Sequence, residues 1–185
     1  MKTSLFCGAA AVLALAGGAG CSSKPDAGQW VGDIVAATDY ESAEGWIPGA
    51  TSISRDHARS GRFADRIDAT HQFGLTFQLP LMQASVHTLR GLDVEAWTYF
   101  SSLSAAGTLE VQVWQHGPGQ DPQPLYSQQL ALREQVTDSC VWTKVNKQFT
   151  LPPNLPGDAS LRIFLWGNPT TKPVYLDDLR IKALE

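Results

Sequence analysis

The chain has 185 residues, of which 43% are hydrophobic and 17% are charged. This composition is typical of a globular protein and excludes an intrinsically disordered chain, and the length suits one ordinary domain with a short tether. The formal net charge of -4 and the lack of a Lys or Arg cluster exclude binding to nucleic acid through its phosphates.

The N-terminus has the features of a signal peptide for export. Lys2 supplies a positive start, and the apolar stretch 5–15 is too short to span a bilayer. Small residues follow, and Gly18-Ala19-Gly20-Cys21 resembles a lipobox, where diacylglycerol is attached to the cysteine sulfur before cleavage. The match departs from the usual pattern at Gly18, where leucine is normal. A competing cleavage site at Ala14-Leu15-Ala16 would instead release a soluble periplasmic protein.

We therefore predict a signal peptide over 1–20, a lipidated Cys21 with its tether over 21–30, and a binding domain over 31–185. The protein would be exported and held to a bacterial membrane by this lipid alone. Ser22-Ser23, with no Asp next to the anchor, resembles lipoproteins sorted to the outer membrane. Cys140 would then be the remaining thiol, and we expect its small apolar side chain to be buried. Without lipidation, a Cys21–Cys140 disulfide is the alternative in an oxidising compartment.

Turn residues are frequent along the chain, which has 11 prolines and 16 glycines without a period. We expect a first strand within 31–40, several short strands over 67–81 and a closing strand over 174–181. Residues 130–136 fit either a helical turn or a strand with its loop, and we favour the strand. No long amphipathic helix stands out. The sequence therefore predicts an all-β fold, a two-sheet antiparallel β-sandwich.

Three segments alternate apolar and polar residues with the period of a strand that has one buried face. They cover residues 92–99, 109–116 and 161–166. In each segment the aliphatic residues share one side, which we expect to face the core. Aromatic and polar residues share the opposite side.

Several short motifs also occur in a characteristic order. They are Asp39-Tyr40-Glu41, Gly45-Trp46, Ala58-Arg59-Ser60-Gly61-Arg62, Trp142 leading to Phe149-Thr150-Leu151-Pro152, and Tyr175-Leu176-Asp177-Asp178-Leu179. This order resembles the galactose-binding-like jelly rolls, especially the CenC-like carbohydrate-binding modules, over roughly residues 34–184. The resemblance implies a jelly roll and packing roles for Trp46 and Trp142. The resemblance predicts the fold more directly than the function, because sugar binders, adhesion modules and accessory domains of enzymes share this fold.

The resemblance further implies a structural calcium ion, held by carboxylates where the first and last strands meet. The candidate ligands are Asp39, Glu41, Asp177 and Asp178. Strand parity would bury Asp177 beside the aliphatic residues that follow it and leave Asp178 in solvent, although a bulge would exchange them. A cation would compensate a buried carboxylate. The alternative is that these acids cap loops or pair with the basic residues nearby.

The aromatic sides of the alternating strands together form one candidate sugar-binding surface. Flat rings stack on the C–H faces of pyranoses, while carboxylate, amide and guanidinium groups bind hydroxyls. The alternative is that the rings are packed in the core or under a loop, because Trp is mostly buried. The predicted ligand-binding residues are Glu95, Trp97, Tyr99, Gln112, Trp114, Arg162 and Trp166.

We expect no catalysis, because the chain has no G-x-S-x-G nucleophile elbow and its four histidines are scattered singly. The first predicted function is a lipid-anchored envelope protein whose sandwich binds a glycan. The second is a structural or assembly lipoprotein that docks another envelope protein. A weaker alternative is a glycan hydrolase, with Glu95 and Glu110 as its pair of acids.

Overall fold

The computed structural model describes residues 34–185 except 44, 46, 48–49, 116–122 and 168. The described residues belong to one compact unit. The predicted signal peptide, Cys21, the tether and Trp46 lie outside the described residues. No helix in the described ranges is long and apolar enough to cross a membrane.

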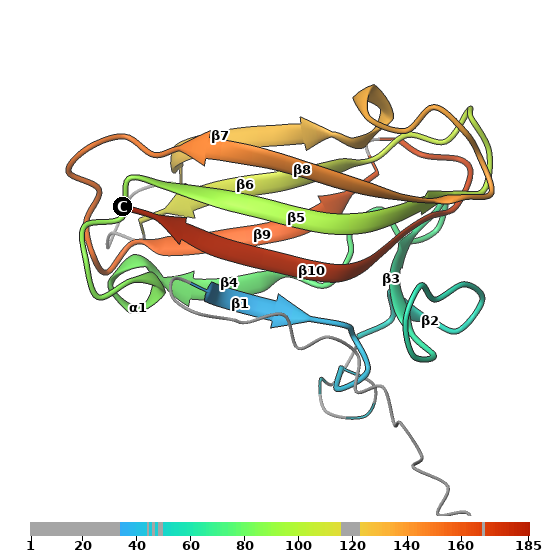
Figure 1. Cartoon of the computed structure of the whole chain (residues 1–185), viewed down its shortest axis with the longest axis horizontal. Helices are drawn as coiled ribbons and strands as arrows, with labels where there is room; N and C mark the ends of the chain where they lie inside the picture. Colours follow the sequence, from blue (N-terminus) through green and yellow to red (C-terminus); the bar gives the residue numbers. More distant parts are fainter. Residues whose placement is uncertain (1–33, 44, 46, 48–49, 116–122, 168) are drawn as a thin grey trace, which may run out of the picture. The chain divides into compact units, whose positions relative to one another are not determined.

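Two antiparallel sheets face each other across one core, as the sequence predicted (Figure 1). A short helix, α1 (Leu81–Ala84), and a 3-10 turn, η1 (Leu132–Glu134), accompany them. Sheet A contains β1 (Ile34–Thr38), β2 (Ile53–Ser54), β3 (Ala64–Ile67), β5 (Gly91–Phe100), β8 (Trp142–Thr150) and β10 (Val174–Leu184). Sheet B contains β4 (Phe77–Pro80), β6 (Thr108–Trp114), β7 (Pro124–Ala131) and β9 (Ser160–Trp166).

The predicted strand parity is confirmed in β5, β6 and β9. Their aliphatic residues are buried between the sheets, while the alternate residues face outward. Removing this apolar surface from water stabilises the fold by about 25 cal/mol per Å². The inward residues of the three strands are Leu92, Val94 and Ala96, then Leu109, Val111 and Val113, and finally Leu161, Ile163 and Leu165.

The segment 130–136 takes both of the forms that the sequence allowed. It continues β7 as far as Ala131 and then turns through η1. The prediction of a buried Cys140 was wrong, because its side chain is exposed. Cys140 has φ 62° in the connection that leads into β8, so it lies in a turn and not in a strand. The alternation of buried and exposed positions in a strand therefore does not determine the exposure of Cys140.

A bulge in β10 changes the face on which Asp177 lies. The pairing of β10 with β5 is regular up to Asp177 and resumes at Arg180, with Asp178 at φ 48° between them. As a result Asp177 pairs with Trp97 and faces outward, whereas Leu179 faces the core. The parity argument that placed Asp177 beside Leu179 was wrong, because the bulge shifts the alternation by one residue. Asp177 is nevertheless fully buried.

Candidate functional site

The outer side of sheet B carries a row of aromatic and polar side chains, which we call the sheet B face. The row comes from the outward positions of the neighbouring strands β6 and β9, where Gln112 pairs with Arg162. Phe73, in the segment before β4, joins the row because it forms a β-bridge with Trp166. The sheet B face consists of Phe73, Gln112, Trp114, Arg162, Phe164 and Trp166.

Trp114 forms one end of the sheet B face. Its indole Nε1–H donates a hydrogen bond of 2.8 Å to Oε1 of Gln112. The guanidinium carbon of Arg162 lies 5.4 Å from the centre of the Trp114 ring. These contacts fix the orientation of the ring, which remains half-buried, and they place an amide and a cation beside it. An aromatic surface next to hydrogen-bonding groups is thereby held in place before any ligand arrives.

Phe73, Phe164 and Trp166 form the other end. The rings of Phe73 and Trp166 are nearly parallel, at 7° with centroids 6.2 Å apart, and Phe73 lies 6.1 Å from Phe164. Phe73 is 60% exposed. Trp166 pairs with Thr108 on β6, and Trp114 follows Thr108 by six residues on the same strand. The two ends of the row therefore lie about 20 Å apart along the strands. Exposed aromatic rings in such a row are typical of an interaction surface.

A buried carboxylate in β3 holds the segment that carries Phe73. Both carboxylate oxygens of Asp65 lie 3.0 Å from the backbone nitrogen of Leu75 and accept its N–H. Gly74 allows this approach, since a Cβ there would lie 2.1 Å from Asp65 Oδ2. Burial raises the pKa of Asp65 to about 6, although hydrogen bonds from Ser52, Leu75 and Arg66 act to lower it. Asp65 thus positions Phe73 from the opposite sheet.

The predicted residues of β5 lie on the other side of the sandwich. Trp97 and Tyr99 face outward from sheet A, and the loop between β2 and β3 covers them. The guanidinium carbon of Arg59 lies 4.2 Å from the centre of the Trp97 ring, and His57 stacks on Tyr99 at 4.4 Å. Figure 1 shows this loop at the end of the sandwich away from α1. These contacts match the loop-covered alternative, and both rings are half-buried beneath the loop.

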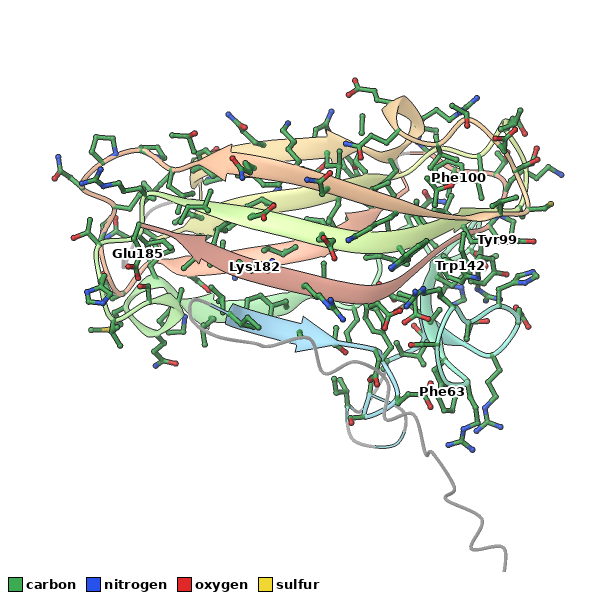
Figure 2. The ribbon with its side chains drawn as sticks, in the orientation of Figure 1. Phe63, Tyr99, Phe100, Trp142, Lys182 and Glu185 are labelled. Carbon is green, nitrogen blue, oxygen red and sulfur yellow. The ribbon has the colours of Figure 1, made fainter. Side chains whose placement is uncertain are left out.

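Trp142 also belongs to this covered cluster. Its ring lies 5.6 Å from the ring of Tyr99, and Figure 2 shows both residues near the same end of the sandwich. Trp142 is half-buried on the outer side of sheet A, so it packs against neighbouring rings outside the core. Trp142 lies on sheet A and Trp114 on sheet B, so a substitution of Trp142 can serve as a control for one of Trp114.

The structure divides the predicted ligand-binding residues between two opposite faces. Gln112, Trp114, Arg162 and Trp166 come together on sheet B, whereas Glu95, Trp97 and Tyr99 lie on sheet A. Parity shows which side chains share a side of one strand, but it does not assign that strand to a sheet. Phe73 was missed, because a single Phe in a turn-rich segment gives no sign of the strand it joins.

The division also separates the acids considered for hydrolysis. Glu95 faces outward from sheet A, where its Oε2 lies 2.8 Å from Nζ of Lys144. Glu110 has outward parity on sheet B, is almost fully buried, and accepts a hydrogen bond of 2.8 Å from the Thr108 hydroxyl. Two carboxyl groups on opposite sides of a sandwich cannot flank one glycosidic bond. The proposed acid pair was therefore wrong.

The four predicted calcium ligands act as hydrogen-bond acceptors for loops. Oδ2 of Asp177 accepts the N–H groups of Arg59 and Ser60, at 2.8 and 3.1 Å, and Oδ1 accepts that of Asp178. The Asp178 carboxylate binds the Arg59 guanidinium at 2.7 Å and the Ser60 hydroxyl at 2.9 Å. Burial raises the pKa of Asp177 to about 6 despite its three backbone donors. This pair fastens the loop that covers Trp97.

Glu41 and Asp39 are engaged in the same way. Oε1 of Glu41 accepts the N–H groups of Arg62 and Phe63, at 2.6 and 2.7 Å, and Oδ1 of Asp39 accepts that of Glu41 at 3.2 Å. Within the described residues, no three His, Cys, Asp or Glu side chains are grouped to hold a metal ion. In the structure these acids therefore accept hydrogen bonds from loop residues, as in the loop-capping alternative, and the calcium ion stays a prediction.

Comparisons with known proteins identify the fold. No protein-family model and no curated protein matches the sequence. The C-terminal family 22 carbohydrate-binding module of Clostridium thermocellum Xyn10B is 12% identical with a TM-score of 0.50, over 83% of this chain and 96% of that one. The CBM22-2 xylan-binding domain of Paenibacillus barcinonensis Xyn10C is 13% identical with a TM-score of 0.50, over 81% and 99%. The described part of the chain thus has the jelly-roll β-sandwich fold of carbohydrate-binding modules.

Proposed function

We propose that this protein binds a glycan on the sheet B face without catalysing its cleavage. The observation that carries the proposal is the pre-arranged row from Trp114 to Phe73, with Gln112 and Arg162 between its aromatic ends. Rings of this kind stack on pyranose faces, and the amide and guanidinium groups bind hydroxyls. The fold supports the proposal, since the similar structures are carbohydrate-binding modules, one of which is described as xylan-binding.

The length of the row indicates the kind of glycan. Its two aromatic ends lie about 20 Å apart along the strands, which exceeds the length of a single sugar ring. A chain of several sugar units would contact both ends and place hydroxyl groups over Gln112 and Arg162. We therefore propose an oligosaccharide or polysaccharide segment as the ligand.

We further propose that the sandwich is exported and anchored by a lipid on Cys21. This proposal rests on the sequence from Lys2 to Cys21, as argued above. The anchor would keep a glycan-binding surface at the cell envelope, with the membrane contacted through the N-terminal lipid. Metabolic labelling with a radioactive fatty acid tests it: wild type should carry the label and Cys21→Ala should not. Label on neither protein would refute the anchor.

A glycan array tests the binding function. The wild-type protein should give signals for plant or envelope polysaccharide fragments, and Trp114→Ala should lose them. Trp142→Ala is the matched control, because it removes a tryptophan from the other face. Thermal unfolding of both variants confirms that they fold. A blank array for the wild type would refute the proposal and favour the assembly lipoprotein, in which the sandwich docks another envelope protein.

A further inference from the structure

A row of polar side chains crosses all four strands of sheet B, between the two aromatic ends of the sheet B face. Gln112 on β6 pairs with Ser127 on β7 and with Arg162 on β9, and Arg162 pairs with Gln78 on β4. Residues directly opposite each other share one face of a sheet, and Figure 1 shows these strands side by side. Neighbouring strands lie about 4.8 Å apart, so adjacent members of this polar row can contact one ligand together.

The contact with Trp114 determines which atoms of Gln112 remain for a ligand. An indole N–H only donates, so the atom that lies 2.8 Å from Trp114 Nε1 is the amide oxygen of Gln112. The indole therefore occupies the acceptor of this side chain. The amide nitrogen of Gln112 carries N–H donors and no acceptor. Toward a ligand on the sheet B face, Gln112 acts mainly as a donor.

The charged residues of sheet B add donors but few acceptors. Within its four described strands, Glu110 is the one acidic residue and Arg162 the one basic residue. Glu110 is 4% exposed and accepts a hydrogen bond from the Thr108 hydroxyl. The exposed Asp158 lies before β9 begins, beyond the position that pairs with Trp114. The Arg162 guanidinium can only donate, whatever it contacts, so the middle of this face is rich in donors.

A ligand that satisfies these donors has to bring acceptors. Gln78 and Ser127 can accept as well as donate, whereas Gln112 and Arg162 offer N–H groups. A sugar hydroxyl can accept from them, but it also brings a proton that needs an acceptor of its own. A carbonyl or carboxylate oxygen accepts without donating, and a guanidinium group binds a carboxylate through paired hydrogen bonds.

We propose that the glycan bound on the sheet B face carries carbonyl or carboxylate substituents, whose oxygens bind Gln112 and Arg162. This proposal rests on the glycan-binding function put forward above and names the class of glycan. The two sources share one chemistry, a planar group with acceptor oxygens. It is either the acetyl group of an acetylated sugar or the carboxylate of a uronic acid. The rings at the two ends of the face would stack on sugar units on either side of the substituted one.

Matched pairs of hexasaccharides test the proposal by calorimetric titration. Chitohexaose and cellohexaose differ in the acetamido group, and hexagalacturonate differs from its carboxyl-reduced counterpart in the carboxylate. In at least one pair, the substituted member should bind at least about tenfold more tightly, because the other member leaves N–H donors unsatisfied. Unsubstituted members that bind as tightly as the substituted ones would overturn the proposal, as would a lack of binding to all of these sugars.

The salt concentration separates the two sources of the acceptor oxygens. Added salt should weaken the binding of hexagalacturonate, because salt screens the attraction between a carboxylate and a guanidinium group. The binding of chitohexaose, which carries no charge, should change little. The member whose affinity exceeds that of its matched sugar, together with this salt response, identifies the substituent.

Gln112→Glu replaces a donor by an acceptor within the polar row. Its carboxylate keeps an oxygen for the indole N–H of Trp114, so the ring stays in place while the amide N–H groups are lost. Affinity for the substituted hexasaccharide should fall at least about tenfold, and affinity for its unsubstituted counterpart should not fall. Gln148→Glu makes the same change at an exposed position on the outer side of sheet A and should leave both affinities as in wild type. An unchanged preference for the substituted sugar in Gln112→Glu would overturn the proposal.

The outcomes distinguish this proposal from glycan binding itself. Wild-type protein that binds only array glycans without carbonyl or carboxylate groups would overturn the assignment of the ligand class and leave the proposed function intact. A blank array would refute both. Melting temperatures of Gln112→Glu and Gln148→Glu show whether each variant folds as the wild type does.

Discussion

Asp65 gives the fold a dependence on pH that can be calculated and tested. Its carboxylate is fully buried in β3, and burial raises its pKa in the folded protein to about 6, from the ordinary value of 3.8 for an aspartate. A raised pKa means that the folded state binds the proton more tightly than the unfolded state. The stabilising effect of protonation is therefore fully present below about pH 4 and is lost as the pH rises through about 6.

The size of this effect follows from the shift. A difference of about two pKa units corresponds to about 3 kcal/mol, at 1.36 kcal/mol per unit. The free energy of unfolding should therefore fall by up to this amount between pH 4 and pH 7 because of Asp65. Asp177, whose pKa is also raised to about 6, adds to the trend. Asp68, whose pKa is lowered to about 2 by hydrogen bonds that outweigh its burial, titrates below this window.

Urea unfolding at several pH values measures the effect. Asp65→Asn retains an acceptor for the N–H of Leu75 but cannot ionise, so its unfolding free energy should vary less between pH 4 and pH 7 than that of wild type. Asp158→Asn is the control, because Asp158 is exposed and should leave the wild-type dependence unchanged. If Asp65→Asn showed the full wild-type dependence, the assignment of this titration to Asp65 would be refuted.

Three further predictions concern stability and exposure. Gly74→Ala should lower the unfolding free energy by about 1–3 kcal/mol and weaken glycan binding, because its Cβ would strike Asp65; unchanged urea unfolding would contradict this. Arg59→Ala should increase acrylamide quenching of Trp97 and leave glycan affinity as in wild type, so weakened affinity would count against a purely structural loop. A thiol titration without denaturant, made on a Cys7→Ser, Cys21→Ser variant, should find one reactive group per chain, at Cys140; no reaction would contradict its exposure.

Much of the fold could be predicted from local pattern. Alternation in β5, β6 and β9 identified the inward and outward residues, because a strand with one buried face must place apolar side chains at every second position. Turn residues marked the connections, and the order of the motifs indicated a jelly roll. Each of these signals depends on neighbours along the chain.

The rest depends on contacts between distant segments. Sequence parity could not reveal that β5 lies in one sheet and β6 in the other, so it combined Trp97 and Trp114 into a single platform. The bulge at Asp178 placed Asp177 and Leu179 on opposite faces, since one extra residue changes the alternation of every later side chain. The covering of Trp97 by Arg59 joins segments far apart in sequence, and no local pattern indicates it.

The most direct test of glycan binding on sheet B follows the indole N–H signals of the tryptophans by NMR during titration with a glycan chosen from the array. Signals of Trp114 and Trp166 should shift with ligand concentration, because both rings belong to the sheet B face. Signals of Trp97 and Trp142, on sheet A, should stay in place. Shifts confined to Trp97 and Trp142 would contradict the account and move the binding surface to the other sheet.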